Sequence, residues 1–184
     1  KNAMIEENRK IVWHPDWAGK RFEDWITNAR DWCISRERYW GTPLPIWTCS
    51  KCGYRIAVGS IEELEKLSET KVIDVHRPWI DKIVLRCPKC GAEMYREPFV
   101  VDVWMDSGMA HTAALNQIGK YDMFEKLFPY DWITEAIDQT RGWFYTLLFT
   151  SVSLYGVAPY KKVLCQGHVL DKYCLLYTSP SPRD

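Results

Sequence analysis

The cysteines carry the first sign of chemistry in this sequence. Two C-x-x-C pairs are separated by 34 residues and are formed by Cys49, Cys52, Cys87 and Cys90. Each pair is followed directly by a glycine, Gly53 or Gly91, which lets the chain turn so that backbone N–H groups point at the thiolate sulfurs. Four thiolates in this pattern predict a tetrahedral zinc site with no open coordination position, which is a structural rather than a catalytic site.

Other uses of these thiols stay open at this point. The four side chains could be buried free thiols or the remains of a site that has lost its metal. Redox chemistry is less favoured, because one C-x-x-C pair would suffice and neither pair lies in a thioredoxin-like context. The odd total of seven cysteines argues against a disulfide framework, and metal binding fits a reducing compartment. Cys33 and Cys165 are expected to be core thiols.

The composition limits the class of protein. A chain of 184 residues suits one domain, or one domain with a small insertion, and 47% hydrophobic residues suffice for a core. The formal net charge is zero, so no bulk electrostatic argument for nucleic-acid binding follows. The polar stretch Lys1–Lys10 lacks a signal-peptide pattern, and no apolar run approaches the roughly 20 residues that span a membrane. We therefore expect a cytoplasmic protein with no membrane association.

Local patterns predict the elements that must position the cysteines. A helix is expected around residues 22–29, whose apolar residues are spaced i, i+3, i+4 and i+7. A second, short helix is expected between the cysteine pairs, because Ser60 and Glu63 form a capping box ahead of Leu64 and Leu67.

The second half of the chain predicts strands and one long helix. Phe99–Trp104 is expected to be a strand, and Asp106–Gly108 a turn. A long helix is expected from about Asp138 to Gly156, followed by a strand at Val163–Leu170. Its apolar face is formed by Phe144, Leu147, Leu148, Val152 and Tyr155. A strand, a long helix and a second strand of this size indicate a βαβ unit and hence a parallel sheet.

Three motifs point to a family. Asn28–Trp47 is similar to the segment that returns from the editing insertion to the catalytic core in synthetases for branched aliphatic amino acids. Asp102–Gly108 (D-V-W-M-D-S-G) resembles the isoleucyl version of the next core motif, whereas valyl enzymes read closer to D-T-W-F-S-S-G. Glu135–Phe144 resembles the isoleucyl motif E-G-x-D-Q-x-R-G-W-F, with Ala136 in place of the usual glycine. The resemblance to class I aminoacyl-tRNA synthetases covers residues 13–172 almost continuously.

This resemblance implies a fold class and a division of the chain. The expected fold is α/β, the second half of a Rossmann-like nucleotide-binding core with a small zinc-knuckle insertion. The family's H-I-G-H and K-M-S-K-S motifs are absent from this sequence, and so are its editing and anticodon-binding domains. The expected parts are the return segment at 1–47, the insertion at 48–96, the second half of the core at 97–172 and a non-native tail at 173–184.

The resemblance also implies an activity for the parent enzyme. It would activate isoleucine with ATP and Mg²⁺, form isoleucyl-adenylate, and transfer the isoleucyl group to tRNA(Ile). The parent would be a monomer, and this fragment alone would be inactive. Alternatives are a valyl or leucyl enzyme, or a stand-alone zinc-knuckle module that binds RNA or protein without catalysis.

Six residues are assigned to the adenylate or amino-acid site by the resemblance, and no residue is assigned a catalytic role. Glu135, Asp138 and Gln139 would accept hydrogen bonds from the ammonium and ribose groups, although acids near a helix start are also favoured by the macrodipole. Trp104 and Trp143 would line an aliphatic pocket, although core packing is the competing interpretation. His168 could meet the adenosine part of ATP, although an exposed polar residue at a strand end is the simpler interpretation.

Overall fold

The computed structural model describes residues 1–115, 121–170 and 172–173. All but one residue of the predicted non-native tail lies outside that description. The chain forms two compact units. We call Lys1–Asp31 with Ser107–Asp184 the α/β unit, and Trp32–Asp106 the cysteine unit. The cysteine unit is wider than the insertion expected at 48–96, and the roles given to the four predicted segments stay predictions.

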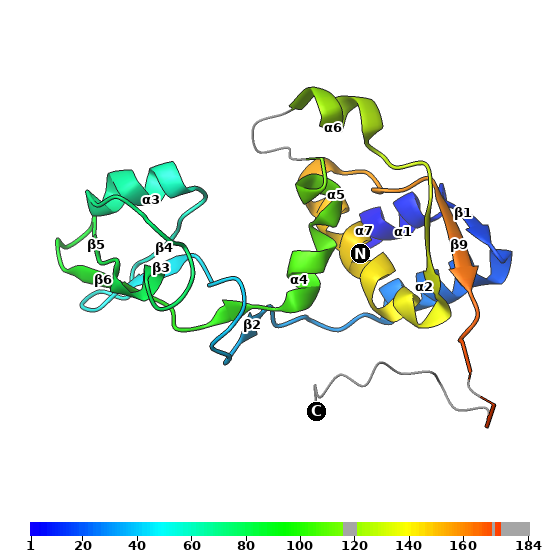
Figure 1. The fold of residues 1–184 in the computed structure, drawn as a ribbon, viewed down its shortest axis with the longest axis horizontal. Helices are drawn as coiled ribbons and strands as arrows, with labels where there is room; N and C mark the ends of the chain where they lie inside the picture. The colour runs from blue at the N-terminus through cyan, green and yellow to red at the C-terminus, as the bar shows by residue number, and fades with distance from the viewer. Residues whose placement is uncertain (116–120, 171, 174–184) are drawn as a thin grey trace. The chain divides into compact units, whose positions relative to one another are not determined.

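A three-stranded parallel sheet forms the centre of the α/β unit. Its strands are β1 (Val12–His14), β8 (Ile133–Ala136) and β9 (Lys162–Gln166), in the order β1-β9-β8. β8 and β9 are adjacent, parallel and joined through α7 (Trp143–Tyr155), so the predicted parallel sheet is confirmed (Figure 1). The strand that precedes α7 is β8, however, and not Phe99–Trp104 as the sequence pattern suggested.

The long helix ends where the sequence predicts and begins later. A 3₁₀ turn, η2 (Ile137–Arg141), occupies the expected first turn, and α7 starts after Gly142. Gly156 ends α7 with φ 74°, a left-handed conformation that favours glycine. The strand expected at Val163–Leu170 is β9, which ends at Gln166.

Helices α1 (Asn2–Asn8) and α2 (Asp16–Asn28) complete the α/β core. Phe22 and Ile26 of α2 are fully buried, as the helical period predicts, and they join Phe144 and Leu148 of α7 in one apolar cluster. The remaining helices of the second half are α4 (Val103–Gly108), α5 (Ala110–Ala113) and α6 (Tyr121–Leu127). Within the described part of the chain, no helix is both long and apolar enough to cross a bilayer.

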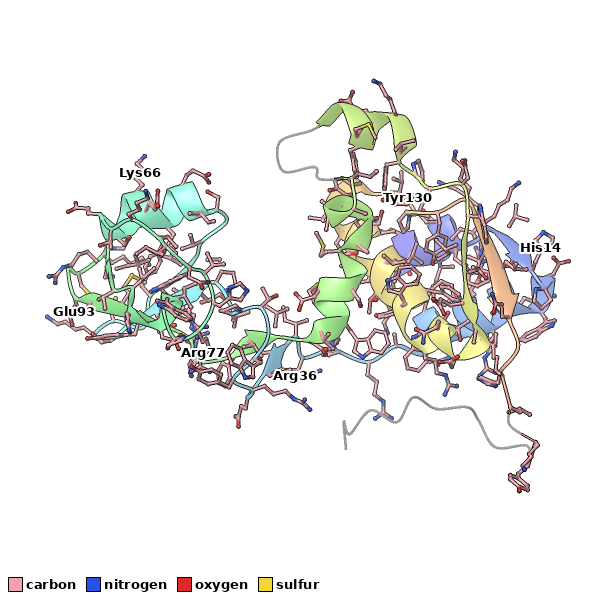
Figure 2. All side chains as sticks on the ribbon, in the orientation of Figure 1. His14, Arg36, Lys66, Arg77, Glu93 and Tyr130 are labelled. Carbon is pink, nitrogen blue, oxygen red and sulfur yellow. The ribbon has the colours of Figure 1, made fainter. Side chains whose placement is uncertain are left out.

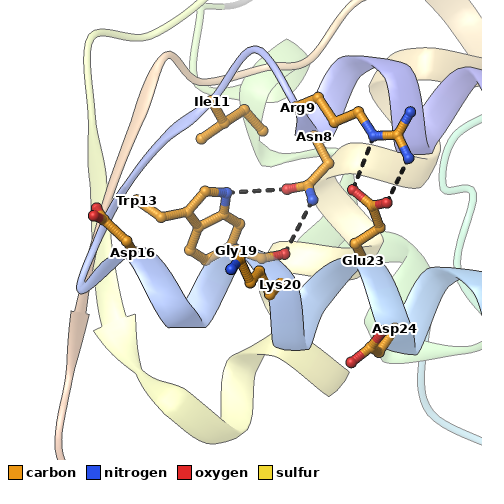
Figure 3. Close-up of a pocket in the computed structure, with 9 residues that line it drawn as sticks. All are labelled: Asn8, Arg9, Ile11, Trp13, Asp16, Gly19, Lys20, Glu23 and Asp24. Atoms are coloured by element: carbon orange, nitrogen blue, oxygen red, sulfur yellow. Dashed lines mark hydrogen bonds and ion pairs between the residues drawn. The ribbon is translucent and has the colours of Figure 1, made fainter.

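Polar contacts join α1 to α2 around an open hollow of about 520 Å³ (Figure 3). Trp13 donates its indole N–H to Asn8 Oδ1 at 3.0 Å, and Asn8 donates to the Gly19 carbonyl at 3.2 Å. A Cβ at Gly19 would lie 2.7 Å from Trp13 Cδ1, so this position requires glycine. Arg9 and Glu23 form a bidentate ion pair across the same hollow.

An antiparallel sheet forms the centre of the cysteine unit. Its strands are β3 (Ile46–Cys49), β4 (Arg55–Ala57), β5 (Leu85–Arg86) and β6 (Glu93–Arg96), in the order β4-β3-β6-β5. Trp47, Leu85 and Met94 are buried between this sheet and the helices α3 (Ile61–Ser68) and η1 (Ile80–Lys82). A separate pair joins β2 (Ser35–Arg36) to β7 (Val100–Val101).

The capping box predicted before α3 is confirmed in its main contact. Ser60 Oγ accepts a hydrogen bond from the Glu63 N–H at 3.1 Å, while Glu63 reaches back to the Gly59 N–H at 2.7 Å. Leu64 is buried, but Leu67 is 39% exposed, so only one of the two predicted apolar positions anchors the helix. Lys66 points away from the unit on the outer face of α3 (Figure 2).

Two predictions around residue 100 are wrong. The strand expected at Phe99–Trp104 is limited to Val100–Val101, which pairs antiparallel with β2. The turn expected at Asp106–Gly108 is helical and belongs to α4. The physical reason is Asp102, whose side chain accepts the Trp104 N–H at 3.0 Å and so starts a helix directly after the strand.

Candidate functional site

The cysteine pairs lie in two turns of the same geometry. Cys49 ends β3 and Cys87 follows β5, and both strands lie beside β6. In each turn, the N–H of the first cysteine donates to a carbonyl five residues later, and the N–H of the glycine donates back to the first cysteine's carbonyl. Gly53 and Gly91 have φ 69° and 72°, so the glycine requirement predicted from the sequence is confirmed.

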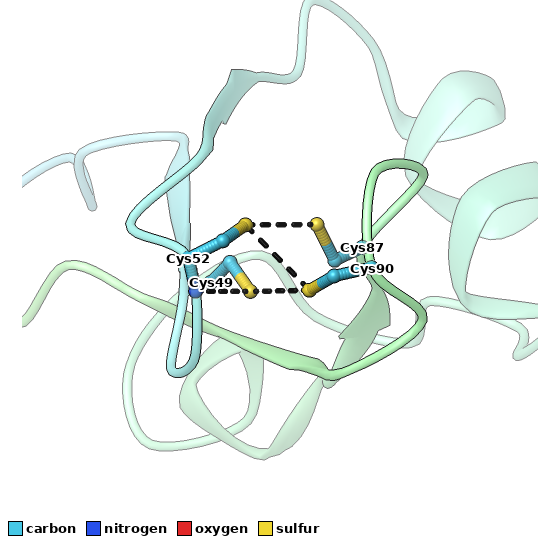
Figure 4. Close-up of side chains that lie close together, drawn as sticks. All are labelled: Cys49, Cys52, Cys87 and Cys90. Carbon is cyan, nitrogen blue, oxygen red and sulfur yellow. Dashed lines mark hydrogen bonds between the residues drawn. The ribbon is translucent and has the colours of Figure 1, made fainter.

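The four sulfur atoms converge on one point (Figure 4). All lie within 4.8 Å of one another, with separations of 3.5 Å for Cys49–Cys90 and 3.6 Å for both Cys52–Cys87 and Cys52–Cys90. A tetrahedral zinc with bonds of about 2.3 Å places its sulfur ligands about 3.8 Å apart. The donor set and its spacing therefore fit a divalent metal ion held by four thiolates.

Backbone dipoles prepare one of these thiols to ionise. The N–H groups of Cys52 and Lys51 both lie 3.4 Å from Cys49 Sγ, and they lower the pKa of Cys49 from its ordinary value of 9.0 to about 6 although burial opposes the shift. At Cys52 the Tyr54 N–H lowers the pKa, but the neighbouring Cys49 sulfur and burial outweigh it and raise the pKa to about 12. Ionisation of one thiol thus disfavours ionisation of its neighbour. A cation at the centre of the cluster would allow all four thiols to ionise.

A second group of predicted site residues gathers in the α/β unit. Glu135 lies near the carboxyl end of β8, opposite Cys165 in β9, and its side chain is exposed. Asp138 and Gln139 follow in η2, where Gln139 Nε2 donates to Asp138 Oδ2 at 3.1 Å. His168 Nε2 lies 3.6 Å from Asp138 Oδ1, so the structure brings the ends of β8 and β9 together through these side chains. The carboxyl ends of parallel strands are where α/β sheets bind their ligands.

Gln139 also makes a hydrogen bond that stabilises the start of α7. Its Oε1 accepts the Trp143 N–H at 2.8 Å and so satisfies an otherwise open donor at the start of α7. The prediction that Asp138 and Gln139 open the long helix is therefore wrong, because they form the 3₁₀ turn before it. Ala136, where the family's motif has glycine, adopts φ −72°, a conformation open to any residue.

The two tryptophans of the predicted aliphatic pocket lie in different units. Trp143 begins α7 of the α/β unit, is partly buried, and donates its indole N–H to the Ser107 carbonyl at 3.0 Å. Trp143 and Leu147 also line an apolar cavity of about 260 Å³ in that unit. Trp104 lies in the first part of α4, which belongs to the cysteine unit, and 42% of it is exposed.

Two buried polar residues escaped the sequence interpretation. Asp102 was read only as part of a motif, yet it is 4% exposed and accepts three hydrogen bonds. His111, which no motif assigned, is 2% exposed and lies within 3.0 Å of the hydroxyls of Thr112 and Thr150. Local sequence patterns do not predict these contacts. Asp102 contacts side chains 70 and 66 residues away, and His111 contacts one that is 39 residues away.

A chain that combines a parallel α/β unit with polar residues at its strand ends and a unit built on a four-cysteine knuckle is expected of a nucleotide-binding enzyme core with a metal-binding insertion. The chain belongs to one such family: residues 1–174 match the model of the tRNA synthetases class I (I, L, M and V). The family resemblance drawn from the three motifs is thereby confirmed.

Curated relatives narrow the match. Residues of this chain are 51% identical over 173 positions to an isoleucine–tRNA ligase of Archaeoglobus fulgidus, which covers 94% of this chain and 17% of the relative. The corresponding enzyme of Pyrobaculum aerophilum is 52% identical over 178 positions, covering 94% and 18%. The chain therefore spans about a sixth of the length of the curated relatives it matches.

A solved structure supports the fold. The chain resembles a LeuRS in the crystal structure of a ternary LeuRS–tRNA–LeuAMS complex from Agrobacterium radiobacter K84, with a TM-score of 0.59. The match covers 82% of this chain and 21% of the other, at 24% sequence identity. At that identity the likeness concerns the α/β fold alone.

Proposed function

We propose that this chain is an internal part of an isoleucine–tRNA ligase. The observation that carries the proposal is the identity of about 50% to isoleucine–tRNA ligases over nearly the whole chain, which favours isoleucine over the valine and leucine alternatives. The parent enzyme would use isoleucine, ATP with Mg²⁺, and tRNA(Ile), and would work as a monomer in the cytoplasm.

The proposed reaction has two steps. A carboxylate oxygen of isoleucine attacks the α-phosphorus of ATP, the bond to the bridging oxygen breaks, and pyrophosphate leaves. A ribose hydroxyl at the tRNA 3′ end then attacks the acyl carbon, loses its proton, and AMP leaves. Neither step forms a covalent bond to the protein, so the protein contributes mainly by positioning the reactants and stabilising charge.

The side chains at the ends of β8 and β9 suit such positioning. Glu135 and Asp138 would accept hydrogen bonds from the isoleucine ammonium or the ribose hydroxyls, and Gln139 offers both an acceptor and a donor. His168 would meet the adenosine part, because its ring lies beside Asp138 at the same strand ends. Trp104 and Trp143 would contact the branched alkyl group with flat apolar faces.

Zinc is the metal we propose for the four cysteines. Four sulfur ligands at tetrahedral spacing leave no position open for substrate, so the ion would be structural and would hold the knuckles together. Cys49, Cys52, Cys87 and Cys90 would each bind it as thiolates, and the amides that face Cys49 Sγ would share the negative charge.

The test is amino-acid-dependent ATP–pyrophosphate exchange by the full-length protein that contains this segment. Isoleucine should support the fastest exchange. A preference for valine or leucine would overturn the isoleucyl assignment, and no exchange with any of the three would favour a zinc-knuckle module without catalysis. The 184-residue chain by itself should show no exchange.

A point variant tests the binding residues. Glu135→Gln should lower isoleucine-dependent exchange roughly 10- to 100-fold, the value of a hydrogen bond to a charged group. Asp131→Asn is the matched control, because Asp131 is an exposed acid of the same unit that pairs with Lys161. Equal rates for wild type and Glu135→Gln would remove Glu135 from the site.

A further inference from the structure

The cluster of four cysteines has a buried side and an exposed side. Cys49 and Cys87, the first cysteine of each pair, are each 3% exposed. Cys52 and Cys90, the second cysteine of each pair, are exposed. All four belong to the cysteine unit, so this difference lies within one compact unit. A small molecule in the surrounding water therefore meets the cluster at Cys52 and Cys90.

The sulfur–sulfur contacts that connect one knuckle to the other differ in the same way (Figure 4). The two contacts that involve the sulfur of Cys49 or Cys87 are partly buried. The contact between Cys52 and Cys90, at 3.6 Å, is exposed. A disulfide has an S–S distance of about 2.05 Å, so these two sulfurs need to approach by roughly 1.5 Å to form one.

Contacts outside the cluster hold the two knuckles against each other. β3 pairs with β6, and Ser50 donates both its N–H and its hydroxyl to the Glu93 carbonyl, at 3.0 and 2.9 Å. Between the loops, the Lys89 ammonium lies 4.2 Å from the centroid of the Tyr54 ring. These contacts keep the exposed sulfurs side by side, so a bond between them can form before the knuckles separate.

We propose that Cys52 and Cys90 are a site of oxidative modification, at which hydrogen peroxide forms a disulfide between the knuckles and releases the metal ion. One thiolate first attacks a peroxide oxygen: an S–O bond forms, the O–O bond breaks, and hydroxide leaves. The sulfur is thereby oxidised by two electrons to a sulfenic acid, and the peroxide is reduced. The second thiolate attacks that sulfur, the S–S bond forms, and the S–O bond breaks with loss of a second hydroxide.

The balance is two thiolates and one peroxide to one disulfide and two hydroxides. The metal ion loses two of its four ligands and leaves the site. This chemistry differs from that of a thioredoxin-like C-x-x-C pair, because the two sulfurs come from different pairs. The inference rests on the proposed zinc site and goes beyond it, since it makes two of the four ligands reactive.

The test treats the zinc-loaded full-length protein with hydrogen peroxide. Released zinc is measured with a chromogenic chelator, and disulfides are located by peptide mass spectrometry. We expect zinc release to accompany a disulfide between Cys52 and Cys90. A dithiol reductant with added zinc should reverse both changes.

Two histidine variants compare an exposed ligand with a buried one, because histidine can replace a cysteine in a structural zinc site but forms no disulfide. Cys90→His removes one member of the exposed pair, and should release zinc at least about tenfold more slowly than wild type at equal peroxide. Cys87→His is the matched control, because it changes the buried cysteine of the same knuckle and keeps the exposed pair. It should release zinc within about twofold of the wild-type rate.

Three results overturn the inference: zinc that stays bound to the wild type under peroxide, a wild-type disulfide that involves Cys49 or Cys87, or equal slowing in the two histidine variants. Failure of the proposed zinc site looks different, because the wild type then holds no zinc before peroxide is added. In that case, or if a variant does not bind zinc, the position of the wild-type disulfide decides the inference.

Discussion

Each of the two units of this chain is stabilised internally by different means. Among the described residues, the α/β unit buries thirteen apolar side chains in one cluster, including Trp13, Phe22 and Phe144. The cysteine unit buries eight, and two of these are the metal-site cysteines Cys49 and Cys87. A core of that size contributes little beyond the conformational entropy that folding costs, so a small unit of this kind needs a metal or another cross-link.

This difference shows which residues are needed for stability and which are available for binding a ligand. In the cysteine unit the residues with the strongest chemistry, the four thiols, would serve stability through the proposed metal ion. In the α/β unit the apolar core is complete without the polar residues at the strand ends, which leaves Glu135 exposed and open to ligand.

The largest expected effect is the loss of the metal. Cys49→Ser with Cys87→Ser removes one thiolate from each knuckle, and the chain should lose its bound zinc, about one ion per chain in the wild type. Structural zinc binding is worth on the order of 10–16 kcal/mol in zinc-finger peptides, far more than an eight-residue core can supply. Metal analysis and amide hydrogen exchange should therefore show the sheet β4-β3-β6-β5 unprotected while α7 keeps its protection.

The control is another thiol of the same unit. Cys33 is exposed, so the expectation that it is a core thiol is wrong, whereas Cys165 is buried as expected. Because Cys33 lies outside the cluster, Cys33→Ser should keep both the zinc and the exchange pattern. Retention of zinc by the double variant would rule out the four-thiolate site. Loss of protection in both units together would remove the contrast drawn between them.

The next largest expected effect is a dependence of the stability of the α/β unit on pH. Burial lowers the pKa of His111 from 6.5 to about 4, because the neutral ring lies among Thr112, Thr150 and Tyr155. The unfolded chain binds a proton at His111 below about pH 6.5 and the folded chain does not, so stability is full above that pH and falls as the pH drops toward 4. The expected loss between pH 7 and pH 5 is about 2 kcal/mol.

Urea unfolding, followed by hydrogen exchange of α7 amides at pH 7 and pH 5, measures this loss. His111→Gln keeps a donor and an acceptor without titrating in this range, and should flatten the dependence. His76→Gln is the control in the other unit, because His76 is exposed and paired only with Asp74 among the contacts the structure describes. An unchanged slope in His111→Gln would mean that other groups set the acid sensitivity of the α/β unit.

Local sequence signals predicted much of this fold. The spacing of Phe22 and Ile26, the glycine at position 156 and the knuckle glycines each act within one turn or one helix, so their consequences can be read from neighbouring residues. Short strands such as β1 and β8 were not predicted, because three or four residues are too few to show an alternation of apolar and polar side chains. Their pairing with β9 joins segments far apart in the sequence.

The candidate sites divide in the same way. The cluster of four cysteines was predictable, because four side chains of one type at fixed spacing suffice to define it. The contacts of Asp102 were not, because Trp32 and Arg36 lie 70 and 66 residues away and no local pattern links them. The meeting of Asp138 with His168 likewise depends on β8 and β9 being adjacent, and the ligand roles of both residues stay predictions.

The smallest expected effect tests how far the metal-dependent region extends within the cysteine unit. Ser60→Ala removes the N-cap of α3 and should cost about 1 kcal/mol. Ser68→Ala, at the other end of the same helix, is the control, because its hydroxyl contacts only Thr70 among the contacts described. α3 is anchored to the unit's core by Leu64, so its amides should exchange faster in Ser60→Ala while zinc content and the protection of β3 stay unchanged. If zinc is lost as well, α3 and the knuckles unfold as one cooperative unit. The apolar core would then stabilise the metal site, and the cysteine unit would differ less from the α/β unit than proposed above.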